Sequence, residues 1–248
     1  MKFRLLIAFI AISLIGQAQN DSLPERRNTI KLNLVTSMLF SNSGALSFER
    51  IIKTNQSWGF MIGYVQFPSL GQISPYISAS NNHTSNYGFV VGGEYRFYLK
   101  KENKFAAPHG VYIGPYANYY LFNNVRDLVY TDPETGVVSN GSMTTSLDVL
   151  NMGFQIGYQF LVNDRWTFDM IFFGPSVSYY KLDTSVTGDI DESLLTGGLA
   201  EALQENFPLL KELIEDKAIN LHGKTSSWGN GFRYQLNVGY HFGRKKKN

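Results

Sequence analysis

The stretch GFRYQLNVGYHF, residues 231–242, decides the fold. From Phe232 to Phe242 every second residue is large and apolar, and the residues between them are mostly polar or small. A period of two is typical of a β-strand with two different faces. The same alternation recurs along the chain with little helix-forming sequence beside it. The question is therefore which solvent the apolar face meets.

We predict eight strands, and their connections alternate in length. The strands are expected at 29–40, 45–52, 58–67, 87–99, 110–122, 150–161, 166–180 and 231–242. Short connections are 53–57, 100–109 and 162–165, and long ones are 69–86, 123–148 and 183–227; only the short 41–44 breaks the alternation. In an antiparallel up-and-down arrangement, alternate connections lie at opposite ends. One end then has short turns and the other has long loops, as in outer-membrane barrels.

This pattern predicts an all-β fold: an eight-stranded antiparallel up-and-down transmembrane β-barrel over residues 29–242. In hydrocarbon every backbone N–H and C=O must be paired, so the sheet must close on itself and turn its apolar face to lipid. The alternative is a soluble barrel of lipocalin type with the apolar face around a ligand cavity. Against it, the second face is rich in Asn, Gln, Gly, Ser and Tyr, which suits a shielded interior better than a wet surface.

The second face is expected to fill the barrel interior, because eight strands leave just enough room for side chains. Charged residues of both signs occur on it, and buried charges need partners. The predicted lumenal polar network comprises Lys31, Glu49, Glu94, Arg96, Asp169, Arg233 and Gln235.

An aromatic girdle is expected at the short-turn end of the barrel. Two tryptophans directly follow short turns, and two aromatic residues end the last strand. The predicted girdle residues are Trp58, Trp166, Tyr240 and Phe242. Such residues gather at the membrane–water interface of outer-membrane barrels.

The first 18 residues have the features of a cleaved secretory signal peptide. Lys2 and Arg4 precede an apolar run, and small residues lead to Ala18. The run is shorter than the ~20 residues of a membrane-spanning helix. Residues 19–28 would form an N-terminal periplasmic segment. The chain has no Cys, which excludes disulfides and thiolate metal sites. Loss of Lys2 and Arg4 lowers the net charge from +2 to 0, so nothing favours nucleic-acid binding.

The last long connection, 183–227, contains a predicted amphipathic helix, or two helices broken near Pro208. Its apolar stripe is Leu195, Leu199, Leu203, Phe207, Leu210, Leu213 and Ile214. The connection carries nine acidic and three basic residues. The stripe needs cover from the barrel mouth, the other loops, lipid or a partner. Interfacial helices favour a basic polar face, so lipid is the less favoured of these.

Sequence motifs for catalysis or metal binding are missing. There is no HExxH, CxxC or GxSxG pattern, and the four histidines lack metal-ligand spacing. We therefore expect no catalytic residue, metal or cofactor. One alternative is a lipid-modifying enzyme using His83 and Ser85, although SASNNHTSN is also a typical turn composition. Another is a narrow solute channel with Glu94 and Arg96 as a charged gate. The basic tail, 243–248, is expected to be solvated or to contact anionic envelope polymer.

The final strand resembles the C-terminal assembly signal of bacterial outer-membrane barrels. Gln235, Tyr240 and Phe242 match it, whereas Asn237 stands where a glycine is usual and the tail continues beyond the aromatic end. The stretches KLNLVTSM, ALSFERII, EYRFYLKK and APHGVYIGPYANYY are similar to a family of small Bacteroidetes-type outer-membrane barrels of unknown function.

This resemblance implies an OmpA/OmpX-like eight-stranded barrel in the outer membrane of a Gram-negative cell. It also implies folding by the barrel-assembly machinery and contact with outer-membrane lipid. It carries no catalytic motif. The function expected from the sequence is non-enzymatic: a surface, structural or binding role through external loops, with an extracellular partner as one option.

Overall fold

A computed structural model describes residues 24, 26–39, 42–66, 77–132, 134–188 and 223–243. This part contains ten strands and one short helix, α2 (Leu34–Leu39). In chain order the strands are β1 (Asn28–Asn33), β2 (Gly44–Lys53), β3 (Gln56–Tyr64), β4 (Ile77–Tyr98), β5 (Gly110–Thr131), β6 (Val138–Val162), β7 (Trp166–Phe173), β8 (Pro175–Gly188), β9 (Gly223–Phe232) and β10 (Gln235–Phe242). None of the helices in these residues is long and apolar enough to cross a membrane.

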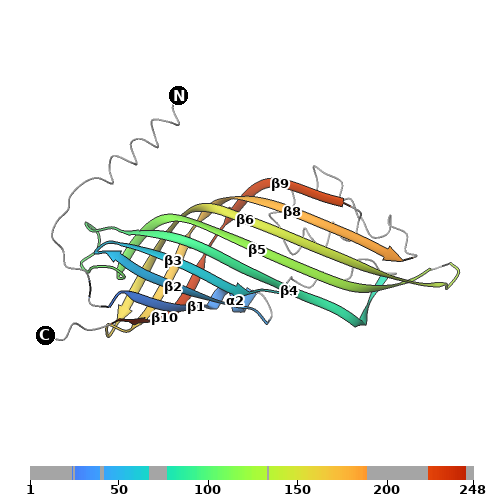
Figure 1. Cartoon of the computed structure of the whole chain (residues 1–248), viewed down its shortest axis with the longest axis horizontal. Coiled ribbons are helices and arrows are strands. Elements are labelled where there is room, and N and C mark those ends of the chain that lie inside the picture. Colours follow the sequence, from blue (N-terminus) through green and yellow to red (C-terminus); the bar gives the residue numbers. More distant parts are fainter. Residues whose placement is uncertain are drawn as a thin grey trace, which may run out of the picture.

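Eight of the strands form a closed antiparallel ring (Figure 1). The order is β5-β4-β3-β2-β1-β10-β7-β6, and the pairing of β6 with β5 closes it. The first and last strands meet from Asn28 opposite Phe242 to Asn33 opposite Asn237. The all-β barrel predicted from the sequence is thus confirmed. The strand expected at 231–242 is corrected, because only residues 235–242 form the ring strand β10, which pairs with β1.

Two long strands of the wall are each broken once, at the same level. Gly174 separates β7 from β8, and Arg233 and Tyr234 separate β9 from β10. The Arg233 amide donates to the Gly174 carbonyl at 2.7 Å, which joins the two breaks. Consequently β6 pairs with β7 over residues 156–162 and with β8 over 141–153.

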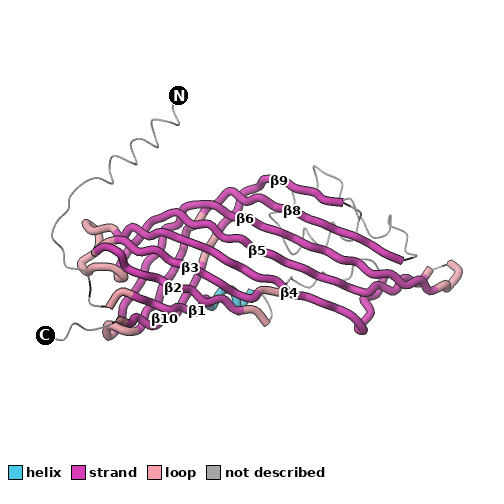
Figure 2. The backbone as a smooth tube through the Cα atoms, viewed as in Figure 1, coloured by secondary structure: helices cyan, strands magenta, loops and turns pink. Residues whose placement is uncertain are grey.

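Beyond the ring, the sheet continues as an open extension. β3 ends at Tyr64, opposite Phe89, whereas β4, β5, β6, β8 and β9 run on away from the end where β1 begins and β10 ends (Figure 2). Over the described residues, β9 pairs with β8 alone. The protein thus has a closed barrel at one end and an open five-stranded sheet at the other.

The extension corrects the predicted loops. The connections expected at 69–86, 123–148 and 183–227 are strand over 77–86, 123–131, 138–148, 183–188 and 223–227. Residues rich in Ser, Thr and Asn therefore form paired strands. The β5–β6 hairpin turns only at 132–137, where Asp132 Oδ1 accepts from the amides of Glu134 and Thr135, each at 2.8 Å.

The first predicted strand is also corrected. It was expected at 29–40 but ends at Asn33, and α2 follows. The Asn33 side-chain oxygen accepts from the Thr36 amide at 3.1 Å, as an N-cap does. A capping residue therefore overrides the apolar alternation of the next positions. The predicted signal peptide 1–18, the loop helix with its seven stripe residues and the basic tail over 244–248 lie outside the described residues.

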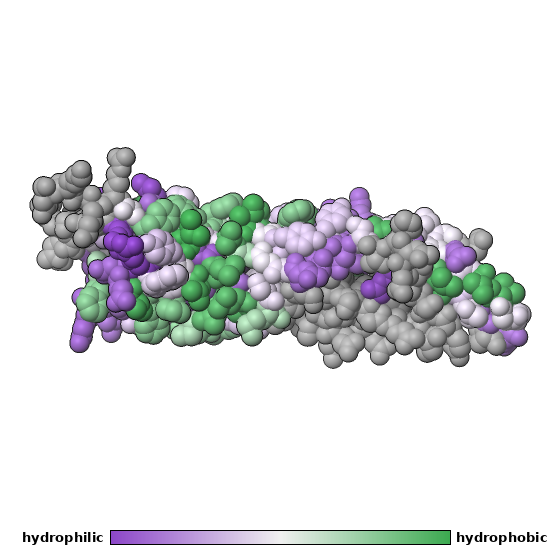
Figure 3. All heavy atoms as spheres, turned by 90° about the horizontal axis from the view of Figure 1, so that it is seen from below, coloured by the Kyte–Doolittle hydropathy of each residue, from purple (hydrophilic) through white to green (hydrophobic). Residues whose placement is uncertain are grey.

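The two halves of the molecule bury opposite kinds of residue. Around the ring the outward face is apolar, and the inward face is polar. The main outward residues, here called the apolar belt, are Ile30, Leu32, Leu46, Phe60, Ile62, Phe89, Val91, Ile113, Met152, Phe154, Phe160, Phe168, Met170, Phe172 and Leu236. The inward face of the extension buries mostly apolar side chains, with Asn124, Thr145 and Thr184 among them. Its apolar residues, here called the extension core, are Phe122, Leu128, Met143, Leu147, Leu182 and Val186. Figure 3 shows the belt as a hydrophobic zone over the ring, with more hydrophilic residues beyond it.

Candidate functional site: the lumenal charge network

Strand alternation aims one set of polar side chains into the ring. Lys31 on β1 lies opposite Gly239 of β10, and Glu94 on β4 lies opposite Gly59 of β3. Both glycines leave room for the long side chains. A Cβ at Gly239 would lie 2.8 Å from Lys31 Cγ, and one at Gly59 would lie 2.9 Å from Glu94 Cγ. The glycines on this face therefore make the space that the charges occupy.

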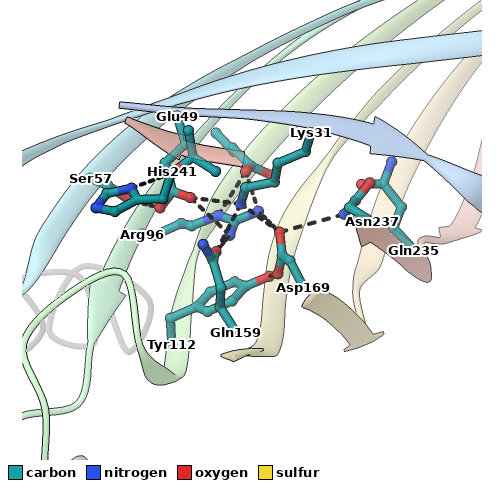
Figure 4. A network of polar contacts seen from close by, with 12 residues as sticks. Lys31, Glu49, Ser57, Arg96, Tyr112, Gln159, Asp169, Gln235, Asn237 and His241 are labelled. Carbon is teal, nitrogen blue, oxygen red and sulfur yellow. Dashed lines mark hydrogen bonds and ion pairs between the residues drawn. The ribbon is translucent and has the colours of Figure 1, made fainter. Parts of the chain in front are cut away.

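Lys31 is the centre of the network (Figure 4). Its ammonium contacts Glu49 Oε2 at 2.6 Å and Asp169 Oδ2 at 2.7 Å. It also donates to Gln159 Oε1 at 2.8 Å. Lys31, Glu49 and Asp169 are each at most 1% exposed. Four strands, β1, β2, β6 and β7, are thereby joined through one buried cation.

Arg96 forms a second bridge across the lumen. Its Nη2 lies 2.9 Å from Asp169 Oδ2 and also contacts Glu94 Oε1. The guanidinium stacks 4.2 Å from the ring centre of Tyr112. Tyr112 in turn donates its hydroxyl to Asp169 Oδ1 at 2.6 Å. Both carboxylate oxygens of Asp169 are therefore engaged, and Arg96 is held by carboxylates from two strands.

The network continues toward the extension through Arg233. Its Nη2 lies 3.1 Å from Glu94 Oε2 and donates to Gln235 Oε1 at 2.7 Å. Its Nη1 donates to Gln155 Oε1 at 2.8 Å, and the guanidinium lies 4.8 Å from the ring centre of Tyr116. Glu94 contacts both Arg96 and Arg233. It therefore joins the contacts of Arg233 to those around Lys31 and Arg96.

Toward the short-turn end, hydroxyl groups complete the contacts. Tyr98 donates to Glu49 Oε1 at 2.8 Å, and Ser57 donates to the same oxygen. Thr29 and His241 share a hydrogen bond of 2.9 Å between Oγ1 and Nδ1. These groups lie in successive layers across the ring, so polar side chains occupy the lumen at several levels.

The network is electrically balanced. Three cations, Lys31, Arg96 and Arg233, face three carboxylates, Glu49, Glu94 and Asp169. Such a set is stable only as a whole, because removing one partner leaves a buried charge uncompensated. Each carboxylate already contacts at least one cation, so the geometry suits a plug that holds the strands together. Within the described residues, no group of three or more His, Asp or Glu could hold a metal ion.

The seven residues predicted for the lumen all lie in this one network. Sequence reasoning left Tyr98, Ser57 and Gln159 out of the set. Tyr98 follows Arg96 by two positions and Gln159 follows Gln155 by four, so strand alternation alone could have placed both inside.

The four predicted girdle residues lie together at the short-turn end. Trp58, Trp166 and Tyr240 are exposed on the outer face, and Phe242 is partly exposed. The rings of Trp166 and Tyr240 meet at 5.6 Å between centres, and Arg165 donates to the Tyr240 hydroxyl at 2.9 Å.

A second aromatic row, missed in the sequence, lies at the opposite edge of the belt. It comprises Tyr64, Tyr87, Tyr119, Tyr179 and Trp228. The rings of Tyr179 and Trp228 are 5.0 Å apart. The sequence signal was available on three strands, because Tyr64, Tyr87 and Tyr179 each end an outward apolar series.

The residues of the alternative enzyme hypothesis lie in the extension. Ser85 is exposed on β4, opposite Val125 of β5. The side chain of His83 lies outside the described residues. Among the described contacts, no residue of the lumenal network touches Ser85.

Comparison with known proteins identifies a family. The family model described as "Protein of unknown function (DUF3575)" matches residues 5–183. The comparison with curated proteins finds no match. The matched family agrees with the resemblance, noted from the sequence, to a family of unknown function.

Two solved structures show a weak likeness to the chain. A major outer membrane protein from Thermus thermophilus has 12% sequence identity and a TM-score of 0.35, with 88% of this chain and 100% of that chain covered. Acinetobacter baumannii CarO2 has 10% identity and a TM-score of 0.37, with 90% and 100% covered. The fold described here rests on the chain's own strand pairing.

Proposed function

The chain belongs to the DUF3575 family of proteins of unknown function, and from its geometry we propose that it is an integral β-barrel of the outer membrane. In this proposal the ring spans the bilayer and the charge network closes its lumen. The extension stands outside the cell and serves a non-enzymatic structural or binding role.

The observation that carries the proposal is the inversion of faces along a single strand. On β6, Phe154 is 67% exposed on the outside while Gln155 and Gln159 are buried inside. Further along the same strand, Met143 and Leu147 are buried inside. A soluble barrel would keep its apolar face inward throughout, whereas a strand that passes from lipid into water must exchange its faces.

The dimensions of the belt agree with a bilayer. On β6 the outward apolar residues run from Leu150 to Val162, twelve residue steps. At about 3.3 Å per residue the run is about 40 Å long. A tilt of about 40° reduces this to about 30 Å across the membrane, close to the height of a hydrocarbon core. The two aromatic rows lie at its edges, where interfacial aromatics are expected.

The orientation follows from the connections. The short turns and the described chain ends share one side, which corresponds to the periplasm in known barrels, and the long extension lies on the other. The polar outer face of the extension, with Ser142, Thr144 and Ser185, suits water. The filled lumen supports a structural plug over the alternative of a solute channel, because the charged groups contact one another across the ring.

The test is heat-modifiability combined with single-cysteine labelling in intact cells. The native chain has no Cys, so each label reports one position. We expect a boiling-dependent gel shift in the outer-membrane fraction. Ser185→Cys should react with a membrane-impermeant maleimide, Phe154→Cys should not, and Glu102→Cys in a short turn should react only after permeabilisation. A soluble periplasmic protein without the shift, or labelling of Phe154→Cys in intact cells, would contradict the proposal.

A further inference from the structure

We propose that a groove on the lipid-facing wall of the ring binds one acyl chain of an outer-membrane lipid. The groove crosses β4, β5, β6 and β8 and has a volume of about 750 Å³. This inference rests on the proposed membrane span and adds a specific lipid site to it.

Small outward residues create the groove. Gly93, Ala117, Met152 and Val177 are neighbours in register across the four strands. At Gly93 and Ala117 the belt lacks the large side chains that it carries elsewhere, and Pro115 adds only a compact ring. The wall is thus hollowed over β4 and β5.

Large side chains form the walls of the groove. Phe154, Met152 and Val177 stand out from β6 and β8 beside the small residues. Phe154 is the most exposed of these side chains. Pro175 begins β8 directly after the break at Gly174, so its position depends on the broken strand. The groove therefore lies beside the break at Gly174, within the apolar belt.

An acyl chain is the occupant that the lining favours. The lining is almost entirely apolar, so it offers little to a polar ligand. An apolar hollow beside hydrocarbon has no polar groups to hold water, and lipid chains are the molecules that surround the belt. The volume is within the range of small-molecule sites, about 300–1,000 Å³.

The residues beyond the groove match the rest of a lipid molecule. Two positions further along the strands come Tyr119 and Tyr179, and two positions beyond them come Asp148 and Lys181. The Lys181 ammonium lies 3.5 Å from Asp148 Oδ2, and its side chain is 43% exposed. Apolar, aromatic and charged groups thus follow one another in the order in which a bilayer changes from chains to headgroups. The alternative occupant is a second copy of the chain, but its binding would not require apolar, aromatic and charged groups in this order.

The test uses a phosphatidylethanolamine with a photoreactive diazirine in one acyl chain, incorporated into vesicles with the full-length protein. Mapping of the adducts by mass spectrometry should show enrichment on Phe154 and Val177 over Phe60 and Phe168, which lie on other strands of the belt. Ala117→Phe should reduce this enrichment to the level seen at Phe60 and Phe168, because the added ring would fill the hollow beside Gly93. Leu121→Phe, on the same face of β5 but outside the lining, should leave it unchanged.

The outcomes separate the two proposals. Equal adducts around the belt, no effect of Ala117→Phe, or protein–protein crosslinks at the groove in place of lipid would overturn the lipid site. Heat-modifiability of each variant is measured in parallel. A wild-type protein without the gel shift would reject the membrane barrel itself, whereas a normal shift with uniform adducts rejects the groove alone.

Discussion

Lys31 shows at the residue scale how the network acts as a unit. One ammonium contacts carboxylates from β2 and β7, and the lysine and both acidic residues are buried away from water. The contribution of the residue is therefore larger than that of a surface ion pair, because its loss leaves two carboxylates facing each other across the lumen. The same reasoning applies to Arg96, which shares Asp169 with Lys31.

Replacing Lys31 tests this dependence. We expect Lys31→Met to lower the free energy of unfolding by about 3–5 kcal/mol, measured by urea titration in detergent micelles or vesicles. The matched control is Lys181→Met, whose pair with Asp148 is partly exposed, and it should change stability by less than about 1 kcal/mol. Equal effects of the two substitutions would show that the buried network does not hold the ring together.

Asp132, at the tip of the β5–β6 hairpin, gives a pH-dependent prediction. Hydrogen bonds from the Thr135 and Glu134 amides lower the pKa of this carboxyl below its ordinary value of 3.8. A lowered pKa in the folded state means that the turn is favoured above pH 3.8 and loses this support as the pH falls through the folded pKa.

Amide chemical shifts measured by NMR can follow this titration. The Thr135 amide signal should move with a midpoint below pH 3.8 in the native chain. In Asp132→Asn, which keeps a side-chain oxygen but cannot ionise, the movement should disappear. A Thr135 titration that persists in the variant would assign the effect to another group.

At the scale of the elements, each ring strand has an apolar outward face and a polar face toward the lumen, and glycines make room on the inward one. Gly59 and Gly93 illustrate the difference. A Cβ at Gly59 would press on Glu94, which two arginines hold in place. A Cβ at Gly93, on the outward face, would meet no atom closer than 4.0 Å. The same substitution should therefore act differently on neighbouring strands.

We expect Gly59→Ala to destabilise the barrel by about 1–3 kcal/mol through overpacking of the lumen. Gly93→Ala is the matched control and should leave the unfolding midpoint almost unchanged. Urea unfolding followed on gels by loss of the heat-modifiable form measures both. If Gly93→Ala proved the more harmful, the assignment of inward and outward faces on β3 and β4 would be wrong.

The elements also show how far sequence reasoning reaches. Alternation placed all eight ring strands and brought the seven charged or amide residues of the network to one face. It failed at Asn33, where a local capping bond ends the strand, and at 77–86, where turn-like composition forms a strand. The two failures have different causes. The first is local, whereas at 77–86 the outcome depends on partners distant in sequence, such as Leu128 opposite Ala79.

At the scale of the whole molecule, the ring and the extension differ in which face of the same strands is apolar. The outward face of the ring is apolar, and its interior is filled with balanced charge. The outward face of the extension is largely polar, and its inward face buries mostly apolar side chains. The level at which the apolar face changes from outward to inward lies near Asp148 on β6 and Lys181 on β8, which pair with each other. Sequence alternation alone could not locate this level, because a period of two looks the same on either side of it.

Spin labels placed singly along β6 should locate the exchange. Labels at Thr144 and Ser146 should be accessible to a water-soluble nickel complex, and labels at Met152 and Phe154 should be accessible to oxygen instead, since oxygen concentrates in hydrocarbon. The switch should fall between residues 146 and 152. Inward labels at Leu147 and Gln155 serve as controls and should be shielded from both reagents. A barrel that is soluble throughout would expose Phe154 to the nickel complex as strongly as Thr144, so the two positions decide between lipid and water as the solvent of the apolar belt.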